Sequence, residues 1–278
     1  MREGNDFVAR VWEQGAKFER HNLPWRHIDG AYAVLVSEVM LQQTQVARVI
    51  KYWNTFLSLF PTLDALAAAD TACVLEQWQG LGYNRRALAL KRTAEICAAD
   101  HAGKLPDTQE GLMALPGIGP ATAAGVLSFA YNQPSVYLET NVRTVFLHEF
   151  FPDGQAVSDK EIYPLVEATC SRENPRDWYY ALLDYGAHLK RTVVNPSRKS
   201  AHHIRQSTFS GSRRQKRAEI LRQVLADPGI TDEALRGSLD EHERQAGRDR
   251  LDEQTYRSIV KDMVAEGFFR GEDGCYFA

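Results

Sequence analysis

With 278 residues and a mass of 31.4 kDa, the chain is long enough for two modest domains. Hydrophobic residues make up 44% and charged residues 25%, as in soluble globular proteins, and no apolar run reaches the roughly 20 residues of a membrane span. The net charge of -3 and the pI near 6.3 argue, on average, against a nucleic-acid partner.

The first twenty residues predict a charged amphipathic helix, without the apolar core and cleavage site of an export signal. Cys73, Cys97, Cys170 and Cys275 lie far apart and lack the close spacing of a zinc ribbon or a cubane cluster. We therefore expect reduced thiols, no metal site and a cytoplasmic location.

Apolar residues at three- and four-residue steps predict an all-helical structure for the first 190 residues. Asp107, with Glu110 three residues later, predicts a capping box at the start of one helix. The predicted helices are Ala31–Tyr52, Thr71–Trp78, Arg85–Asp100, Gln109–Leu115, Ala121–Tyr131, Asn141–Phe150, Lys160–Ser171 and Asp177–Lys190.

An irregular linker is predicted for Thr192–Arg214, which is rich in Ser, Asn, Pro, His and basic residues. From Lys190 to Arg222 the chain has ten Lys or Arg and one acid, Glu219. Such a run fits either a solvated linker or a stripe that contacts phosphates.

Three more helices are predicted, at Lys216–Ala226, Thr231–Leu239 and Glu253–Glu266, before a hairpin that turns at Glu272–Asp273–Gly274. This order favours a winged-helix module, and the alternative is a small helical cap on the first domain. The predicted organisation is a helical domain at 1–190, a basic linker at 191–214 and the small module at 215–278.

The segment Leu115–Ala123, LPGIGPATA, predicts a tight hairpin between two helices. Gly117 and Gly119 permit the turn, Ile118 fills the gap between the helices, and the outward amides can hold an anion. This pattern grips a DNA phosphate without reading bases. A plain turn is the alternative, and polymerases, ligases and nucleases also carry such hairpins.

Two acids stand out. Glu38 is the only acid in SEVMLQQTQV (Ser37–Val46), a run that also contains several glutamines. Glu139, in VYLETNVRTVF, comes just before a helix that is expected to begin at Asn141. An ordinary helix cap is the alternative role for Glu139.

Six segments occur in the order and spacing of the helix-hairpin-helix DNA glycosylases. The chain resembles that superfamily over about residues 7–190, above all the MutY-type adenine DNA glycosylases. The resemblance implies an all-α, two-lobed glycosylase fold that binds DNA with the target nucleotide flipped out, followed by the small winged-helix-like domain. The segments are LPWR (Leu23–Arg26), SEVMLQQTQV, GLGY (Gly80–Tyr83), LPGIGPATA, LETNV and LLDYGA (Leu182–Ala187).

The resemblance also implies roles for single residues. Glu38 matches the acid that protonates the leaving base, and Glu139, with Asn141, matches the group that stabilises the sugar cation. The base pocket would include Trp25, Arg26, Ala121 and Tyr180. DNA contacts are expected from Gln42, the wedge Gln43, the intercalating Tyr83, the hairpin residues Gly117, Ile118 and Gly119, and the basic Arg198, Lys199, Arg213 and Arg214.

The sequence departs from the family at several positions. Glu139 replaces an aspartate, and Tyr180 replaces the glutamine or glutamate that touches adenine. Ala121 stands where bifunctional relatives carry a lysine, so no lyase chemistry is expected by that route. TVVNPSRKSAHHIRQST replaces the four cysteines of an iron–sulfur cluster, which predicts a clusterless variant without a cofactor, and His202 and His203 are interpreted as linker residues.

The predicted function is that of a monofunctional DNA base-excision glycosylase, acting on adenine mispaired with 8-oxoguanine or guanine. The alternatives are a glycosylase for a different damaged or mismatched base, or a non-catalytic DNA-binding protein on a glycosylase fold. The expected partner is double-stranded DNA with such a base, bound by a monomer at the bacterial nucleoid and not at a membrane.

Overall fold

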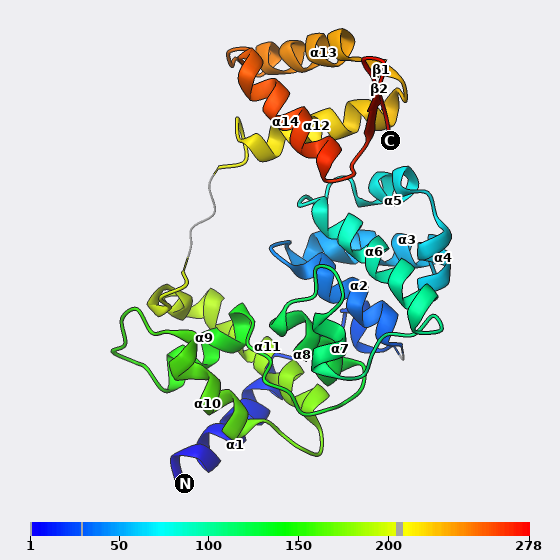
Figure 1. Ribbon diagram of the computed structural model, residues 1–278. Helices are drawn as coiled ribbons and strands as arrows, with labels where there is room; N and C mark the ends of the chain where they lie inside the picture. Colours follow the sequence, from blue (N-terminus) through cyan, green and yellow to red (C-terminus); the bar gives the residue numbers. More distant parts are fainter. Residues whose placement is uncertain (1, 29, 204–207) are drawn as a thin grey trace. The chain divides into compact units, whose positions relative to one another are not determined.

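The computed structural model describes residues 2–28, 30–203 and 208–278, and it separates into two compact units (Figure 1). Unit 1 comprises residues 1–39 and 105–205, and unit 2 comprises residues 40–104 and 206–278. No helix in the described parts is both long and apolar enough to cross a membrane.

Unit 1 is helical and its core lies between α11 and the helices packed on it, α1 and α9. Trp178 and Tyr179 of α11 and Phe146 of α9 are fully buried there. Gly15 lets α1 approach α11 closely, because a Cβ at that position would collide with Ala181. The elements are α1 (Arg2–Lys17), η1 (Pro24–Arg26), α2 (Ala31–Leu41), α7 (Gln109–Met113), α8 (Pro120–Phe129), α9 (Thr140–Glu149), α10 (Asp159–Thr169), α11 (Pro175–Thr192) and η2 (Pro196–Lys199).

Unit 2 combines four helices from the first half of the chain with the C-terminal module, residues 208–278. The four helices are α3 (Val46–Leu59), α4 (Leu63–Ala68), α5 (Thr71–Trp78) and α6 (Arg85–Asp100). Phe56 and Trp78 meet edge to face in their core, with ring centroids 5.8 Å apart.

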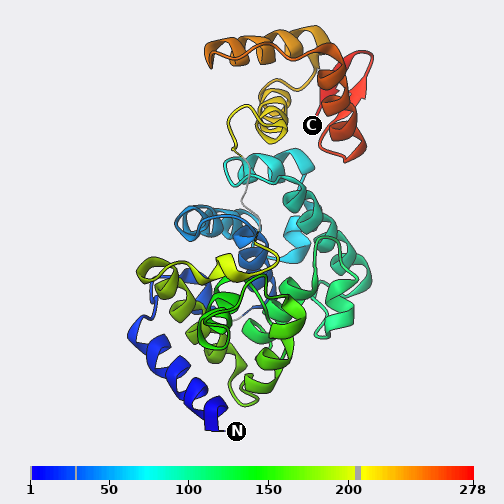
Figure 2. The same cartoon turned by 90° about the vertical axis from the view of Figure 1, so that its left-hand side faces the viewer.

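The C-terminal module consists of α12 (Arg213–Ala226), β1 (Ile230–Thr231), α13 (Asp232–Gln245), α14 (Glu253–Ala265), β2 (Arg270–Glu272) and β3 (Cys275–Phe277). Its sheet has the antiparallel order β1-β3-β2, with Tyr276 paired to Ile230 on one side and Gly271 on the other. The C-terminal strands are drawn in red in Figure 2. The three predicted helices and the hairpin are present in winged-helix order. The additional strand β1 was not predicted, because two residues give no alternating pattern.

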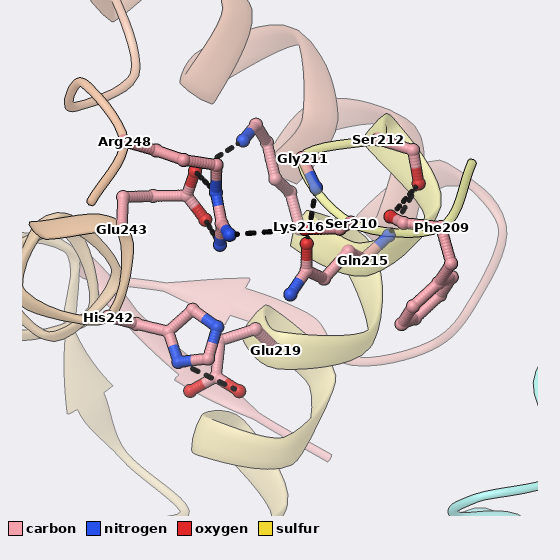
Figure 3. Close-up of polar contacts among 10 residues, drawn as sticks. All are labelled: Phe209, Ser210, Gly211, Ser212, Gln215, Lys216, Glu219, His242, Glu243 and Arg248. Carbon is pink, nitrogen blue, oxygen red and sulfur yellow. Dashed lines mark hydrogen bonds and ion pairs between the residues drawn. The ribbon is translucent and has the colours of Figure 1, made fainter. Parts of the chain in front are cut away.

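Glu243 of α13 fastens the start of α12 within this module (Figure 3). It is 1% exposed and accepts hydrogen bonds from Lys216 Nζ at 2.7 Å and from Arg248 Nε and Nη2, both at 2.9 Å. Arg248 also donates to Ser210 Oγ at 3.4 Å. The hydrogen bonds to Arg248 and Lys216 lower the pKa of Glu243 to about 2.

Three local predictions were wrong. The helix predicted over Ala31–Tyr52 is interrupted between Leu41 and Val46, where Gln43 takes a left-handed φ of 54°. Val39 and Val46 keep a helical spacing of seven residues across the polar run Gln42–Gln45, so the spacing did not reveal the break.

The capping box predicted at Asp107 is also wrong, because the Thr108 side chain caps α7 by accepting from the Gly111 amide at 3.2 Å. The predicted linker is not irregular throughout. It contains η2, and Ser200 forms a parallel bridge with Val157. Tertiary contacts hold residues 196–200 of this segment, and the composition does not show them; residues 204–207 lie outside the described residues.

Candidate active site

Glu38 projects from α2, in which residues 33–37, 39 and 40 are buried and, apart from Ser37, apolar. Its Oε2 accepts a hydrogen bond from Tyr137 Oη at 3.2 Å. Burial raises the pKa of Glu38 to about 8, against a lowering by the Tyr137 hydrogen bond and a further rise from the charge of Glu139. Near neutral pH this carboxyl group therefore keeps a proton that it can give to a ligand.

Gly125 of α8 lies against Glu38. A Cβ at this position would collide with the Glu38 carboxyl group and lie 3.0 Å from Cε2 of Tyr137. Only a glycine lets α8 approach the acid this closely. Ala121, where no lyase lysine stands, is exposed one turn earlier on the same face of α8.

Glu139 is the N-cap residue of α9, as its position in the sequence suggested. Its Oε1 accepts from the backbone amides of Asn141 at 2.5 Å and Val142 at 3.0 Å. The positive end of the helix dipole and two N–H groups thus hold this second carboxylate near Glu38.

Arg26 and Tyr180, two predicted base-pocket residues, lie together. Arg26 donates to both carboxylate oxygens of the buried Asp184, at 2.7 and 2.8 Å, and its guanidinium lies 4.5 Å from the centroid of the Tyr180 ring. Tyr180 also stacks on Phe129 at 4.7 Å. Because its ring contacts Arg26 and Phe129, the hydroxyl group is the part of Tyr180 best suited to a ligand. Trp25, beside Arg26, is 6% exposed.

The predicted hairpin is present between α7 and α8. Gly117 has a left-handed φ of 75°, Ile118 is buried at 6% exposure, and Gly119 is the exposed N-cap residue of α8. The backbone amides at the start of α8 are thus placed as an anion-binding turn requires.

In unit 2, Arg86 ties together the two loops that carry the predicted wedge and the intercalating residue. Its Nη1 donates to the carbonyl oxygen of Gln42 at 2.7 Å, and its Nη2 donates to that of Gly82 at 2.8 Å. Gln43 and Tyr83 both have left-handed backbones, with φ of 54° and 49°. Burial lowers the pKa of Arg86 to about 10.

Arg214 of the C-terminal module contacts the loop that carries Tyr83. Its Nη1 donates to Tyr83 Oη at 2.7 Å, and its guanidinium lies 5.6 Å from the centroid of the Tyr83 ring. Glu266 adds a second link, because it accepts from Arg85 of α6 and from Arg217 of α12. Arg213 is paired with Asp262 at 2.6 Å.

The basic run Lys190–Arg222 does not form one exposed band among the described residues. Lys190 donates to Asn141, and Lys199 donates to the carbonyl oxygens of Phe151 and Pro152. Arg198, by contrast, is exposed. Some basic side chains of this run therefore bond to other groups of the protein, whereas others face the solvent.

A four-cysteine iron–sulfur cluster does not fit the segment that follows α11. Ser197 Oγ lies 2.8 Å from Thr144 Oγ1, and the Val157 amide donates to the carbonyl oxygen of Lys199 at 2.8 Å. The four cysteines of the chain lie elsewhere as free thiols. Among the residues whose positions are described, no group of three or more His, Cys, Asp or Glu could hold a metal ion.

Sequence reasoning missed Tyr137, Gly125 and Asp184 around the acid in unit 1, and Arg86 between the two loops of unit 2. Tyr137 and Asp184 were within segments singled out for other residues, and Gly125 follows the hairpin in an alanine-rich helix. Their partners lie far away along the chain, 99 residues for Tyr137 and Glu38 and 158 for Asp184 and Arg26. No local pattern could have shown these pairs.

The part of the chain that contains Glu38 and Glu139 matches a known protein family. A family model described as HhH-GPD superfamily base excision DNA repair protein matches residues 36–170, which include Glu38, Tyr137, Glu139 and Asn141. The C-terminal module lies outside that match.

Two relatives are adenine DNA glycosylases. The protein of Mycobacterium tuberculosis is 39% identical over 187 residues, which cover 66% of this chain and 60% of the relative. The human protein is 36% identical over 193 residues, which cover 65% of this chain and 34% of the relative. The chain thus spans less than two thirds of the length of each.

A solved structure of a thermostable thymine-DNA glycosylase is similar in fold. It covers 67% of this chain and 87% of its own length, with a TM-score of 0.59 and 22% identity. This likeness confirms the fold class predicted from the sequence.

Proposed function

The chain belongs to the HhH-GPD superfamily of base excision DNA repair proteins, and from this premise we propose that it is a monofunctional DNA glycosylase. Its substrate would be adenine mispaired with 8-oxoguanine or guanine in double-stranded DNA. The observation that carries the proposal is Glu38, whose pKa is raised to about 8 beside a second carboxylate, Glu139.

The acid would act on a nucleotide flipped out of the duplex. Glu38 gives its proton to a ring nitrogen of the base, and the C1′–N bond then breaks with its electron pair leaving on the neutral base. Glu139 stabilises the positive charge that develops on the sugar. Water adds to C1′ and loses a proton, so the products are a free base and an abasic site.

DNA would be held by contacts in both units. In unit 1, the amides around Gly117 and Gly119 bind a phosphate. In unit 2, Gln43 and Tyr83 enter the duplex from the two loops that Arg86 joins. Further contacts would come from Gln42, Ile118, Arg198, Lys199, Arg213 and Arg214.

The proposed enzyme needs no cofactor and cleaves no DNA strand. Ala121 has no amine, so it cannot form a Schiff base with the sugar. The side chains after α11 bond to α9 and its neighbours where the family would hold a cluster.

Tyr180 supports a second candidate, a glycosylase for a different damaged or mismatched base. Its ring is occupied by Arg26 and Phe129, so a ligand would meet a phenol where relatives offer an amide or carboxylate. A hydroxyl group both donates and accepts one hydrogen bond at a base edge, and it is less selective for adenine.

The test is a single-turnover excision assay on a panel of duplexes. The panel contains adenine opposite 8-oxoguanine, guanine and cytosine, then deaminated, alkylated and oxidised bases. We expect adenine release from the 8-oxoguanine and guanine pairs, leaving an abasic site that breaks only with alkali, and no adduct trapped by borohydride. Release of another base would favour the second candidate. Tight DNA binding without any release would replace both proposals with a non-catalytic DNA-binding protein.

A further inference from the structure

Lys190 is a half-buried lysine of unit 1 that the proposed mechanism leaves without a role. It lies near the end of α11, and its Nζ donates to Oδ1 of Asn141 at 2.7 Å. Burial lowers the pKa of Lys190, while the nearby charge of Glu139 raises it. The side chain thus points to the start of α9. It does not contribute to the basic stripe predicted for Lys190–Arg222.

Gly186 brings this face of α11 against Asn141. It lies one turn before Lys190, and a Cβ there would collide with the carbonyl oxygen of Asn141 and lie 2.9 Å from its Cβ. One face of α11 therefore contacts Asn141 twice, at its backbone through Gly186 and at its side chain through Lys190.

The chemistry of an ammonium group fixes the orientation of the Asn141 amide. Lysine has three N–H donors and no acceptor, so the amide turns its oxygen toward Lys190. The two N–H donors of the amide are then the groups that Asn141 can offer a ligand. Its backbone N–H donates to Glu139 Oε1 at 2.5 Å, which links the same residue to the second carboxylate.

Two of the charges around the ammonium are cations that have acidic partners of their own, and the third is the Glu139 carboxylate. Arg143 and Arg20 both lower the pKa of Lys190, and each is paired with an aspartate, at 2.7 Å to Asp159 and 2.5 Å to Asp184. Lys190 is bonded instead to a neutral amide. Its contribution is a directed hydrogen bond more than an ion pair.

We propose that Lys190 is a positioning residue, which orients the Asn141 amide to donate to an oxygen of the bound nucleotide and holds Asn141 beside Glu139. The inference rests on the proposed glycosylase function and deepens it. It gives the segment after the family match a part in catalysis, because Lys190 lies beyond residue 170.

The sign of the effect separates positioning from simple electrostatics. Removing a positive charge near Glu139 would, by Coulomb interaction alone, strengthen the attraction for a cationic sugar. Loss of the Asn141 orientation would weaken it, since a misplacement of about 1 Å can cost roughly a hundredfold in rate. A fall on removing Lys190 therefore reports position.

The variants are Lys190→Met, Lys190→Arg, Asn141→Ala and the double variant Lys190→Met with Asn141→Ala. The control is Lys91→Met in unit 2, which removes a buried lysine whose Nζ donates to the backbone oxygen of Ala67 at 3.1 Å and pairs with Glu95 at 3.0 Å. Two quantities are measured in the full chain. One is the single-turnover excision rate on the best duplex, and the other is the affinity ratio between duplexes with a cationic pyrrolidine and a neutral tetrahydrofuran abasic analogue.

In Lys190→Met we expect the rate and the preference for the cationic analogue to fall about 10- to 100-fold, with little change in affinity for the neutral duplex. Lys190→Arg should recover part of the loss, because it keeps a donor. The double variant should be no slower than Asn141→Ala, since coupled residues lose one shared effect. Lys91→Met should change neither quantity.

A preference for the cation that rises or stays constant in Lys190→Met overturns the proposal, and so do additive losses in the double variant. The affinity ratio keeps this test apart from that of the proposed function. If the wild type releases no base, the glycosylase proposal fails. The role of Lys190 then stands or falls on whether the preference for the cationic analogue drops in Lys190→Met.

Discussion

Two glutamates in different regions of the molecule show how the surroundings decide what a carboxyl group can do. Glu38 of unit 1 receives one phenol hydrogen bond, and its pKa rises to about 8. Glu243 of the C-terminal module receives Lys216 and Arg248, and its pKa falls to about 2. A buried acid without a cation keeps its proton for chemistry, whereas one with two cations holds helices together.

The largest effect is expected from removing the proton donor. Glu38→Gln keeps the size of the side chain but has no proton to transfer, so the excision rate should fall by at least ~10² to 10⁴. DNA affinity should change little, because phosphate contacts dominate it. Glu241→Gln is the matched control on the exposed face of α13, and it should leave the rate unchanged. If Glu38→Gln excised at the wild-type rate, Glu38 would not be the proton donor.

The next largest effect should come from Gly125→Ala. The new Cβ collides with the Glu38 carboxyl group, so the acid must move, and the excision rate should fall by roughly a hundredfold. The same crowding of a buried position should lower the free energy of unfolding by about 1–3 kcal/mol, so the rate is measured well below the unfolding temperature of the variant. Gly237→Ala, at a helical glycine of α13 with open space around it, is the control. An unchanged rate in Gly125→Ala would show that excision does not depend on the position of the Glu38 carboxyl group.

Glu243→Gln tests the structural half of the comparison. Removing the charge leaves Lys216 and Arg248 without their carboxylate, and the C-terminal module should lose about 1–3 kcal/mol of stability. Faster hydrogen exchange of the α12 and α13 amides in the full chain would report this loss. The folded pKa lies below the usual value of 4.5, so the contribution is present above pH 4.5 and disappears as pH falls toward 2. Equal exchange in variant and wild type at pH 7 would contradict the assignment.

The smallest effect concerns the pH profile. Because protonated Glu38 is the active form, the excision rate should fall about tenfold per pH unit above its pKa of about 8. Tyr137→Phe removes the hydrogen bond that lowers this pKa, so the falling limb should move to higher pH, with less than a tenfold change on the plateau. A limb that moves to lower pH would mean that the variant has let water reach the acid.

The same two glutamates should respond to pH in opposite directions. The folded pKa of Glu38 lies above its ordinary value, so its contribution to stability is complete below pH 4.5 and is lost as pH rises through about 8. The contribution of Glu243 to stability is lost as pH falls. Unit 1 therefore keeps an acid that costs stability where it is ionised, as functional sites often do.

Local patterns in the sequence were sufficient for much of the fold. Apolar spacing located most helices, the hairpin at Gly117 and Gly119 followed from its residues, and Glu139 was placed correctly before α9. These features depend on neighbours within a few residues, where backbone geometry and capping act. The break at Gln43 was missed; the turn there is held by Arg86, which donates to the Gln42 carbonyl from 44 residues away along the chain.

The sequence alone determined which residue types were available: one acid in an apolar helix, a second before another helix, and a hairpin for a phosphate. Only the tertiary structure decided the protonation state and the orientation of these side chains. The proton on Glu38 depends on burial and on Tyr137, 99 residues away, and the orientation of Asn141 depends on Lys190, 49 residues away. A pKa and an amide orientation are set by whatever surrounds a group in space, and folding brings those surroundings together from distant parts of the chain.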